Sequence, residues 1–398
     1  MKLAKRVSEI RPSATLSINA KAQELRKKGI KVISFAVGEP DFNTPLNVKQ
    51  MAIQAVVRNQ SRYTPASGME ALKEAVCLWV ENNYGLRYSP SNVLISCGGK
   101  HALYNVFQAI LDPGDEVLIP APYWVSYPDM VVLAGGVPSI AYTSFDDKYK
   151  ITPELLRKSI TEKTKALIIN SPSNPTGVHY SEDELRALAK VLLDYPDLWI
   201  ISDDIYSHIL FNGNKWTNIV MVEPSLKERT VIIHGVSKTY AMTGWRIGFA
   251  IGSKELIKAA SNIQSQSTSN PCSIAQWASL AALLGDQSDV KVMVKSFESR
   301  CGYVMERLKA ISGVRFVEPQ GAFYIFPDVS AFYGRSFEDG KIKDSASMAN
   351  YLMDKAHIAV VPGIEFGDDR CIRLSYALSM KDLEEGCNRL KTALEALR

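Results

Sequence analysis

Short runs of apolar, often β-branched residues recur between residues 32 and 251, and longer segments with a helix-like spacing of apolar residues separate them. Runs of this length are typical of buried strands. The predicted strands cover residues 32–37, 93–95, 116–119, 166–169, 198–201, 231–233 and 247–251. The predicted helices cover residues 11–29, 47–59, 69–83, 100–111, 124–134, 153–160 and 181–194. The alternation of strands and helices between residues 93 and 201 predicts an α/β fold whose largely parallel sheet is covered by helices on both faces.

After the last of these strands the pattern changes, and a long charged helix is predicted over residues 290–311. Apolar stretches at 314–317 and 322–326 and a helix at 381–397 follow it, while the polar segment 334–347 indicates a mobile loop. This part of the chain therefore predicts a second, smaller α+β domain. The sequence contains no internal repeat and no low-complexity linker.

Composition narrows the class of protein. The chain has 398 residues, of which 46% are hydrophobic and 22% charged, and its formal net charge of +4 is spread without Lys or Arg blocks. An ordinary globular protein is expected, with no nucleic-acid and no membrane partner. The six cysteines lie far apart without Cys-x-x-Cys spacing, which predicts reduced thiols and no metal site. The N-terminus lacks the apolar stretch of a signal peptide, so we expect a cytoplasmic protein.

The first candidate site residues follow the predicted strand 231–233. Ser237 and Lys238 lie on the loop beyond it, and Arg246 precedes the next apolar run. Ligands of open α/β sheets bind beyond the carboxyl ends of the strands. A partly desolvated lysine keeps some neutral amine that can attack a carbonyl carbon, while a serine hydroxyl and a guanidinium suit phosphate oxygens. The group favours a carbonyl compound that carries a phosphate, although a solvated lysine and a surface arginine would explain each residue alone.

A second loop follows the predicted strand 93–95. Gly99 and Lys100 stand there at the start of a predicted helix, where free backbone N–H groups bind anions. The spacing of the glycines differs from that of Walker and dinucleotide-binding loops, which argues against a nucleotide. A tight turn is the ordinary alternative for such a segment.

Three further loops carry candidate groups. Asn174 lies in a loop stiffened by two prolines, and Asp203 follows the predicted strand 198–201. A carboxylate at the end of a buried strand needs a cation or donors, and a protonated ring nitrogen would satisfy Asp203. Asp204 is the competing carboxylate, which could instead begin the next helix. Trp124 could stack on a flat heterocycle, with an ordinary aromatic cluster as the alternative.

These motifs jointly resemble those of the class I aminotransferases of the aspartate aminotransferase fold, which use pyridoxal 5′-phosphate. The resemblance runs along nearly the whole chain. It rests on Gly38-Glu39-Pro40-Asp41, Tyr63-Thr64-Pro65, Gly98-Gly99-Lys100, Ser171-Pro172-Ser173-Asn174-Pro175-Thr176-Gly177, Asp203-Asp204-Ile205-Tyr206, Ser237-Lys238 through Arg246, and Arg373-Leu374-Ser375-Tyr376. In one respect the chain departs from the family, which usually has Glu where Asp204 stands.

The resemblance implies the fold of the type I pyridoxal-phosphate-dependent transferases. A mostly parallel seven-stranded sheet is then expected in a large α/β/α domain, beside a smaller α+β domain. The expected division gives residues 1–45 to an N-terminal arm and part of the small domain. It gives residues 46–290 to the large cofactor-binding domain and residues 291–398 to the small C-terminal domain.

The resemblance also implies a role for each candidate residue. Lys238 would bond to the cofactor and then carry the proton of the reaction, Asp203 would pair with the pyridinium nitrogen, and Tyr206 would donate to the ring hydroxyl oxygen. Further cofactor contacts are implied for Gly99, Lys100, Trp124, Asn174, Ser237 and Arg246, and for Tyr63 from a second subunit. Substrate contacts are implied for Gly38, Trp124, Asn174, Arg373, Lys100 and Thr15.

The implied activity is transfer of an amino group between aspartate or glutamate and a 2-oxo acid such as 2-oxoglutarate. It would proceed by a ping-pong mechanism in a homodimer with shared active sites. A prephenate or aromatic aminotransferase, and a β-elimination lyase on the same fold, stay open as alternatives. A regulator built on this fold would need a basic DNA-binding domain, and the sequence offers none.

Overall fold

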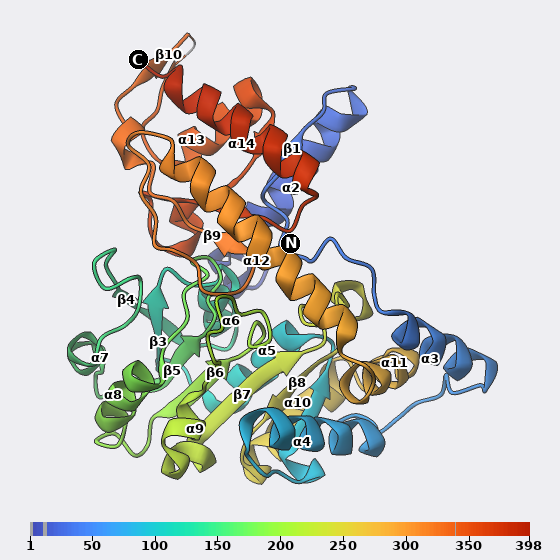
Figure 1. Cartoon of the computed structure of the whole chain (residues 1–398). Helices are drawn as coiled ribbons and strands as arrows, with labels where there is room; N and C mark the ends of the chain where they lie inside the picture. The colour runs from blue at the N-terminus through green and yellow to red at the C-terminus, as the bar shows by residue number, and fades with distance from the viewer. Residues whose placement is uncertain (1–2, 11–13, 339) are drawn as a thin grey trace.

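The computed structural model describes residues 3–10, 14–338 and 340–398 and forms two lobes (Figure 1). The larger lobe is built on a seven-stranded sheet in the order β2-β8-β7-β6-β5-β3-β4. Its strands are β2 (Val93–Ser96), β3 (Glu116–Ala121), β4 (Val137–Tyr142), β5 (Thr164–Asn170), β6 (Trp199–Asp203), β7 (Thr230–Gly235) and β8 (Gly248–Ile251).

All neighbouring strands run parallel except that β8 is antiparallel to both β7 and β2. The α/β fold class with a mostly parallel seven-stranded sheet is therefore confirmed. The hydropathy pattern gave no indication of β4, because this edge strand is only partly buried and its residues do not form an apolar run.

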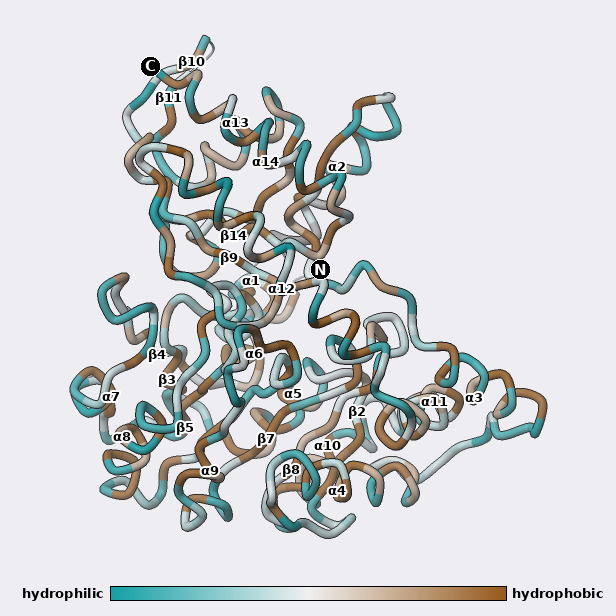
Figure 2. The backbone as a smooth tube through the Cα atoms, in the orientation of Figure 1, coloured by the Kyte–Doolittle hydropathy of each residue, from teal (hydrophilic) through white to brown (hydrophobic). Residues whose placement is uncertain are grey.

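Helices cover both faces of the sheet, as predicted. One face packs against α5 (Gly99–Ile110), α6 (Ser126–Leu133) and α10 (Lys254–Ser267). The other face packs against α4 (Glu70–Tyr84) and α11 (Ser273–Leu284) at one end and against α7 (Pro153–Ser159), α8 (Glu182–Leu192) and α9 (Ile219–Val222) at the other. Figure 2 shows the hydrophobic residues concentrated along the central strands, with hydrophilic residues on the outer turns near α7 and α8. The helix α3 (Leu46–Val57) projects from the side of this lobe (Figure 1).

The smaller lobe combines segments from both ends of the chain. The N-terminal strand β1 (Ile33–Ser34) pairs with β12 (Ile358–Ala359), and a three-stranded sheet has the order β13-β14-β9. Its strands are β13 (Val361–Pro362), β14 (Ile372–Ser375) and β9 (Tyr324–Ile325). The helices of this lobe are α2 (Ala14–Lys27), α13 (Ser345–Ala356) and α14 (Met380–Glu395). The short α1 (Lys5–Glu9) precedes them along the chain, and the first three residues of the predicted helix 11–29 lie outside the described residues.

One prediction for this lobe was wrong. The segment 334–347, predicted as a mobile loop, contains the hairpin of β10 (Ser336–Phe337) and β11 (Gly340–Lys341) and the start of α13. These short polar elements carry little hydrophobic signal of their own. The apolar stretch 314–317 forms no strand, and within it only Arg315 makes a β-bridge, to Asp328. Within the described ranges, no helix is long and apolar enough to cross a membrane.

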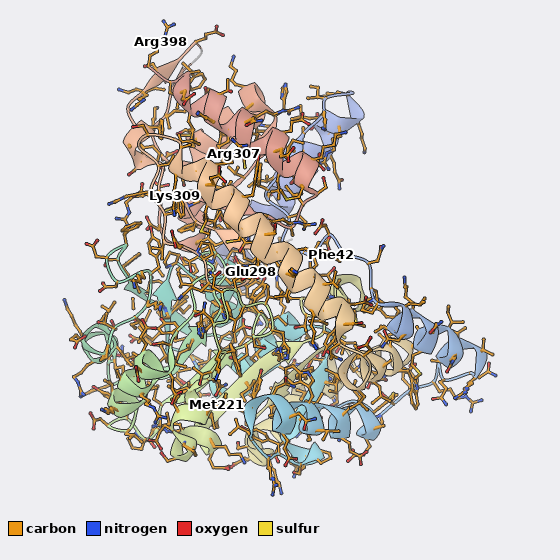
Figure 3. The ribbon with its side chains drawn as sticks, viewed as in Figure 1. Phe42, Met221, Glu298, Arg307, Lys309 and Arg398 are labelled. Atoms are coloured by element: carbon orange, nitrogen blue, oxygen red, sulfur yellow. The ribbon has the colours of Figure 1, made fainter. Side chains whose placement is uncertain are left out.

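The long helix α12 (Ser288–Lys309) joins the lobes. It runs from the larger lobe toward Arg307 and Lys309 in the smaller one (Figure 3). Phe42, on the segment after β1, packs its ring edge-on against Phe297 of this helix at a centroid distance of 5.4 Å. Arg300 of α12 makes two hydrogen bonds to the carboxylate of the neighbouring Asp41, at 2.6 and 3.0 Å. These contacts hold the N-terminal segment against the interlobe helix.

The start of α5 lies directly on the sheet, and glycine makes this possible. A Cβ atom built on Gly248 of β8 would come within 2.1 Å of the backbone nitrogen of Gly99. Any side chain at residue 248 would therefore push the first turn of α5 away from the strand ends.

We predict that Gly248→Ala destabilises the protein by about 1–3 kcal/mol or more, because the added methyl group must displace backbone atoms. Urea unfolding would measure the loss. Gly302→Ala is a suitable control, since Gly302 lies within α12 and a Cβ there would have no neighbour within 4 Å. Equal stabilities of the two variants would contradict the close approach described here.

Candidate active site

Three parallel strands end side by side and define the site. Residue Asn170 at the end of β5 pairs with Asp203 at the end of β6, and Asp203 pairs with Ile233 of β7. Beyond the end of β7 the chain turns through Ser237 and Lys238. The carboxyl ends of these strands thus carry the carboxylate and the amine to the same edge of the sheet.

Lys238 is half-buried, and its ammonium donates a hydrogen bond to the carbonyl oxygen of Gly38 at 2.7 Å. Burial lowers the pKa of this amine to about 8, and the nearby guanidinium groups of Arg246 and Arg373 act in the same direction. The carboxylates of Glu39 and Asp203 oppose the shift. About a tenth of the amine is therefore neutral at pH 7, far more than for an ordinary lysine.

Asp203 is buried, and the hydroxyl of Tyr127 donates to its Oδ2 at 2.6 Å. The backbone N–H of Ile205 donates to Oδ1 at 3.3 Å. Burial raises the pKa of Asp203 to about 6, although these hydrogen bonds and the charge of Lys238 favour the ionised form. The carboxylate can still gain a partner, since a cation beside it would remove much of the desolvation penalty.

The neighbouring carboxylate, Asp204, is turned into the interior. It accepts hydrogen bonds from Ser202 at 2.7 Å and from Asn218 at 2.9 Å. A turn and not a helix follows Asp204, which corrects the alternative considered for it. Its carboxylate is satisfied by Ser202, two residues earlier, and by Asn218, and not by the N–H groups of a helix start.

The proline-containing loop after β5 is tied to the carboxylate strand by Asn170. The side-chain amide of Asn170 donates to the carbonyl of Asp203 at 2.8 Å, and its Oδ1 accepts from the backbone N–H of Asn174 at 2.9 Å. This bridge fixes where Asn174 lies. The Oδ1 atom of Asn174 in turn accepts from Arg373 at 3.1 Å.

Arg373 of β14 is buried with 3% of its surface exposed. Its guanidinium donates to the carbonyl of Ala36 at 2.8 Å as well as to Asn174, and its Nε has no hydrogen-bond partner. Burial lowers its pKa, and no carboxylate of the described residues pairs with it. A buried guanidinium in this state is well suited to receive a ligand carboxylate.

Two tyrosines stand beside Arg373. The guanidinium lies 4.6 Å from the ring centroid of Tyr324, and the hydroxyl of Tyr324 is 2.9 Å from the hydroxyl of Tyr206. Burial raises the pKa of Tyr206 well above its usual value, so this hydroxyl stays protonated. The Tyr206 hydroxyl can therefore act as a hydrogen-bond donor in the site.

The first turn of α5 and Arg246 form a basic corner of the site. The backbone of Arg246 is left-handed, with φ of 55°, and its guanidinium donates to the carbonyls of Thr243 at 2.8 Å and Cys97 at 3.3 Å. A Cβ on Gly98, the residue before α5, would meet this guanidinium at 2.3 Å. Ser237 is buried on the adjoining turn. Exposed helix N–H groups, a guanidinium and a hydroxyl are typical of a phosphate site.

Lys100 and Trp124 lie at the rim of this corner. The Lys100 ammonium lies 4.9 Å from the centroid of the Trp124 ring. Burial lowers the pKa of Lys100, and the charge of Arg246 contributes to the shift. The Trp124 ring packs edge-on against Tyr127, the donor to Asp203. The Lys100 side chain is thus folded over the site's aromatic ring.

Tyr63 does not join this group within one chain, and the position of the Thr15 side chain is not described. Tyr63 is 92% exposed, on a loop between α3 and α4. Thr15 lies in the first turn of α2, but its side chain is outside the described part of the structure.

Three residues of the site were not predicted from the sequence: Tyr127, Asn170 and Tyr324. Tyr127 and Tyr324 lie in apolar segments that resemble ordinary core, and Asn170 is a strand-terminal residue without a motif of its own. Their hydrogen bonds to Asp203, Asn174 and Tyr206 exist only because distant segments meet. The one available signal was the position of Asn170 at the end of a predicted strand.

The arrangement combines an amine of lowered pKa, a buried carboxylate, an anion site and a guanidinium without an acidic partner among the described residues. It can hold a phosphorylated carbonyl compound next to an organic acid and move protons between them. Among the described residues, no cluster of His, Cys, Asp and Glu could hold a metal ion.

Comparison with known proteins gives a consistent result. Residues 30–390 match the family model described as aminotransferase class I and II. The aspartate/prephenate aminotransferase of Nitrosomonas europaea is 46% identical over 99% of this chain and 100% of its own length. The aspartate aminotransferase of Bacillus subtilis is 46% identical over 99% of both chains. The crystal structure of the aspartate aminotransferase from Rhizobium meliloti covers both chains completely, with a TM-score of 0.97 and 42% identity.

We predict that Arg373→Met stabilises the ligand-free protein by about 1–2 kcal/mol, because a well-packed apolar residue replaces a buried charge that lacks an acidic partner. The free energy of unfolding in urea would measure the gain. Arg370→Met is the control, since that guanidinium is half-exposed and paired with Asp368 at 2.7 Å. A loss of stability in Arg373→Met larger than in the control would show that the guanidinium is already compensated.

Proposed function

The chain belongs to the class I and II aminotransferase family, and from this premise we propose that it transfers an amino group between aspartate or glutamate and a 2-oxo acid, with pyridoxal 5′-phosphate as its cofactor. The observation that carries the proposal is the buried guanidinium of Arg373, whose Nε has no partner and which faces the amine-bearing edge of the sheet. A substrate carboxylate would supply the missing negative charge.

The residues present fit pyridoxal phosphate. Its phosphate would meet the backbone N–H groups of Gly99 and Lys100, the hydroxyl of Ser237 and the guanidinium of Arg246. The close packing of α5 on β8 supports this fit. A side chain at residue 248 would collide with the backbone of Gly99, so glycine there keeps the start of α5 in position. A bound dianion would also balance the positive charges of Arg246 and Lys100. In the ligand-free protein, burial lowers the pKa of Lys100 and the charge of Arg246 lowers it further.

When bound, pyridoxal phosphate supplies an aldehyde that accepts the amino group and a ring that withdraws electrons from the substrate's α-carbon. Asp203 would hold a proton at the ring nitrogen, since an ion pair there relieves the desolvation that raises its pKa to about 6. Tyr206 and Asn174 would donate to the ring hydroxyl oxygen. Trp124 would lie against the ring and limit the access of water.

Lys238 would bond to the aldehyde and, once released, move a proton at the α-carbon. Its pKa of about 8 suits this role, because a base works best when its pKa lies near the pH of the reaction. The carbonyl of Gly38 would hold the free amine while the substrate reacts.

The choice of aspartate or glutamate rests on Lys100. Lys100 is an exposed residue whose ammonium lies over the Trp124 ring of the site, so it can reach a second carboxylate of the substrate. A lysine is a flexible point charge that accepts carboxylates at more than one distance. This tolerance also supports a second candidate substrate, prephenate, because the Nitrosomonas europaea relative is named for both activities. Thr15 is proposed as a further contact.

We infer a homodimer with shared active sites. The support is the 92% exposure of the Tyr63 ring, which a partner subunit would cover if this residue reached that subunit's phosphate. The projecting helix α3 adds exposed apolar side chains at Leu46, Ile53 and Val57. Burying them against a second copy would remove apolar surface from water.

We predict that borohydride fixes pyridoxal phosphate on Lys238 and on no other lysine. Peptide mapping by mass spectrometry of the reduced protein would locate the label. Lys238→Ala should bind the cofactor without acquiring the label, and Lys100→Ala should be labelled like the native protein. A label on another lysine would overturn the assignment.

We predict that Lys100→Ala lowers kcat/KM for aspartate by about 10–100-fold, the range for a charge-assisted hydrogen bond. Activity on phenylalanine should change little, because that substrate has no distal carboxylate. Arg373→Ala is the contrasting variant and should lose roughly 10²–10³-fold with both substrates. The assay includes a panel of 2-oxo acids: turnover that does not require one would favour β-elimination, and equal losses in Lys100→Ala would refute the dicarboxylate preference.

A further inference from the structure

A chain of side chains runs from the surface to the strand that carries the lysine. It starts at Asn83 near the end of α4, passes through His208 and Ser207, and ends at His234 in β7. Three hydrogen-bond contacts connect these four side chains. The distances are 3.1 Å from His208 Nε2 to Asn83 Oδ1, 3.0 Å from His208 Nδ1 to Ser207 Oγ and 2.9 Å from Ser207 Oγ to His234 Nε2.

Backbone groups fix which atom donates and which accepts at both ends of this hydrogen-bond chain. At the inner end, the N–H of Gly235 donates to His234 Nδ1 at 2.7 Å. At the outer end, the amide nitrogen of Asn83 donates to the carbonyl of Trp79 at 2.7 Å, so its Oδ1 faces His208 as an acceptor. A backbone N–H can only donate and a carbonyl can only accept.

One arrangement of protons with neutral rings satisfies both ends and all three side-chain contacts. His234 Nδ1 accepts, so its proton is on Nε2 and is donated to the Ser207 oxygen. His208 donates from Nε2 to Asn83, so its Nδ1 accepts the single hydroxyl proton of Ser207. Both imidazoles are neutral in this arrangement: a second proton on His234 Nδ1 would face the N–H of Gly235, and one on His208 Nδ1 would turn the Ser207 hydroxyl proton out of the chain. Burial lowers the pKa of His208 to about 4 and that of His234 well below its usual value, in agreement with this arrangement.

Aromatic packing holds the two rings in place. The Trp79 ring stacks on His208 at 4.9 Å and lies 4.7 Å from His234, and Phe249 of β8 stacks on the other imidazole, His234, at 5.5 Å. Ser207 and His234 are buried. Rotation of either ring to a different hydrogen-bond pattern would disturb this packing.

The chain connects two segments that serve the proposed reaction. Ser207 directly follows Tyr206 in the turn after Asp203, the last residue of β6, and Gly235 is the last residue of β7, three positions before Lys238. The three contacts join only Asn83, His208, Ser207 and His234, and none of these four side chains is one of the candidate site residues. A fixed distance between the turn and the strand end is what the carboxylate and the amine require to act on one ligand.

We propose that Ser207, His208 and His234 are positioning residues that hold the end of β7, and with it Lys238, in register with Asp203 and Tyr206. The inference rests on the proposed role of Lys238, but its tests observe the hydrogen bonds and the amine directly and need no turnover. Ser207 is the central member, because its hydroxyl is the only group that both accepts from one imidazole and donates to the other.

The proton arrangement is tested by NMR of the full-length protein with ¹⁵N-labelled histidine. Long-range nitrogen–proton spectra should show both His208 and His234 neutral and protonated on Nε2 at pH 7. His208 should remain neutral down to about pH 5. Protonation of His208 on Nδ1, or its titration near the ordinary value, would overturn the proposal.

The positioning role is tested on the amine in the cofactor-free full-length protein. Competitive acetylation followed by mass spectrometry gives the pH at which Lys238 becomes reactive, expected near 8 in the native protein. Ser207→Ala leaves His234 Nε2 without an acceptor and loosens the strand end. Water then reaches the amine, and we expect the midpoint to rise by about 0.5 pH unit or more, toward the ordinary lysine value.

Matched variants separate positioning from general destabilisation. Ser207→Thr keeps the hydroxyl and should retain the native midpoint. Ser279→Ala removes another buried serine, whose hydroxyl donates to Ala275 within α11, and should also leave the midpoint unchanged. His234→Asn keeps an acceptor near Gly235 but cannot reach Ser207, so it should shift the midpoint like Ser207→Ala and remains informative if that variant does not fold. A native midpoint in both Ser207→Ala and His234→Asn would refute the role, whatever their catalytic activity.

Discussion

The burial of charge at one edge of the sheet is the constraint on which the rest of the structure depends. Lys238, Asp203 and Arg373 approach one another in surroundings from which water is largely removed, and burial is the main cause of the shifted pKa of each. Such groups are costly unless donors and acceptors are fixed around them. Backbone carbonyls of Gly38 and Ala36 supply two of these contacts. Arg373 still has an unpaired Nε and no carboxylate partner among the described residues, which costs stability and makes the site receptive to an anionic ligand.

This constraint explains why the two ends of the chain return to the same place. The segment that carries Gly38 follows β1, which pairs with β12 near the C-terminus, and Asp41 on the same segment is held by Arg300 of α12. The acceptor for Lys238 is thus anchored to the interlobe helix. Arg373, on the small-lobe strand β14, reaches the same region from the other side. A change in how the lobes sit would therefore alter the contacts of the amine and of the guanidinium together.

The parallel sheet and most of its helices were predictable from hydrophobic periodicity, because long buried elements leave a clear pattern. The candidate residues at the strand ends were predictable for the same reason: a strand's carboxyl end and the loop after it are local features. Short or half-exposed elements were not. The edge strand β4 and the hairpin of β10 and β11 are held by pairing with other segments, and their own sequences carry little apolar signal.

The sequence by itself determined which side chains stand at the ends of the strands, and its motifs indicated the family. Only the tertiary structure decided their chemical state. Asp203 and Asp204 are adjacent and identical in type, yet one faces Tyr127 in the site and the other is enclosed by Ser202 and Asn218. Likewise, Ser207 and the histidines at 208 and 234 form a directed hydrogen-bond chain that no local pattern reveals. The physical reason is that desolvation and hydrogen-bond partners come from segments far apart in the chain, and these meet only when it folds.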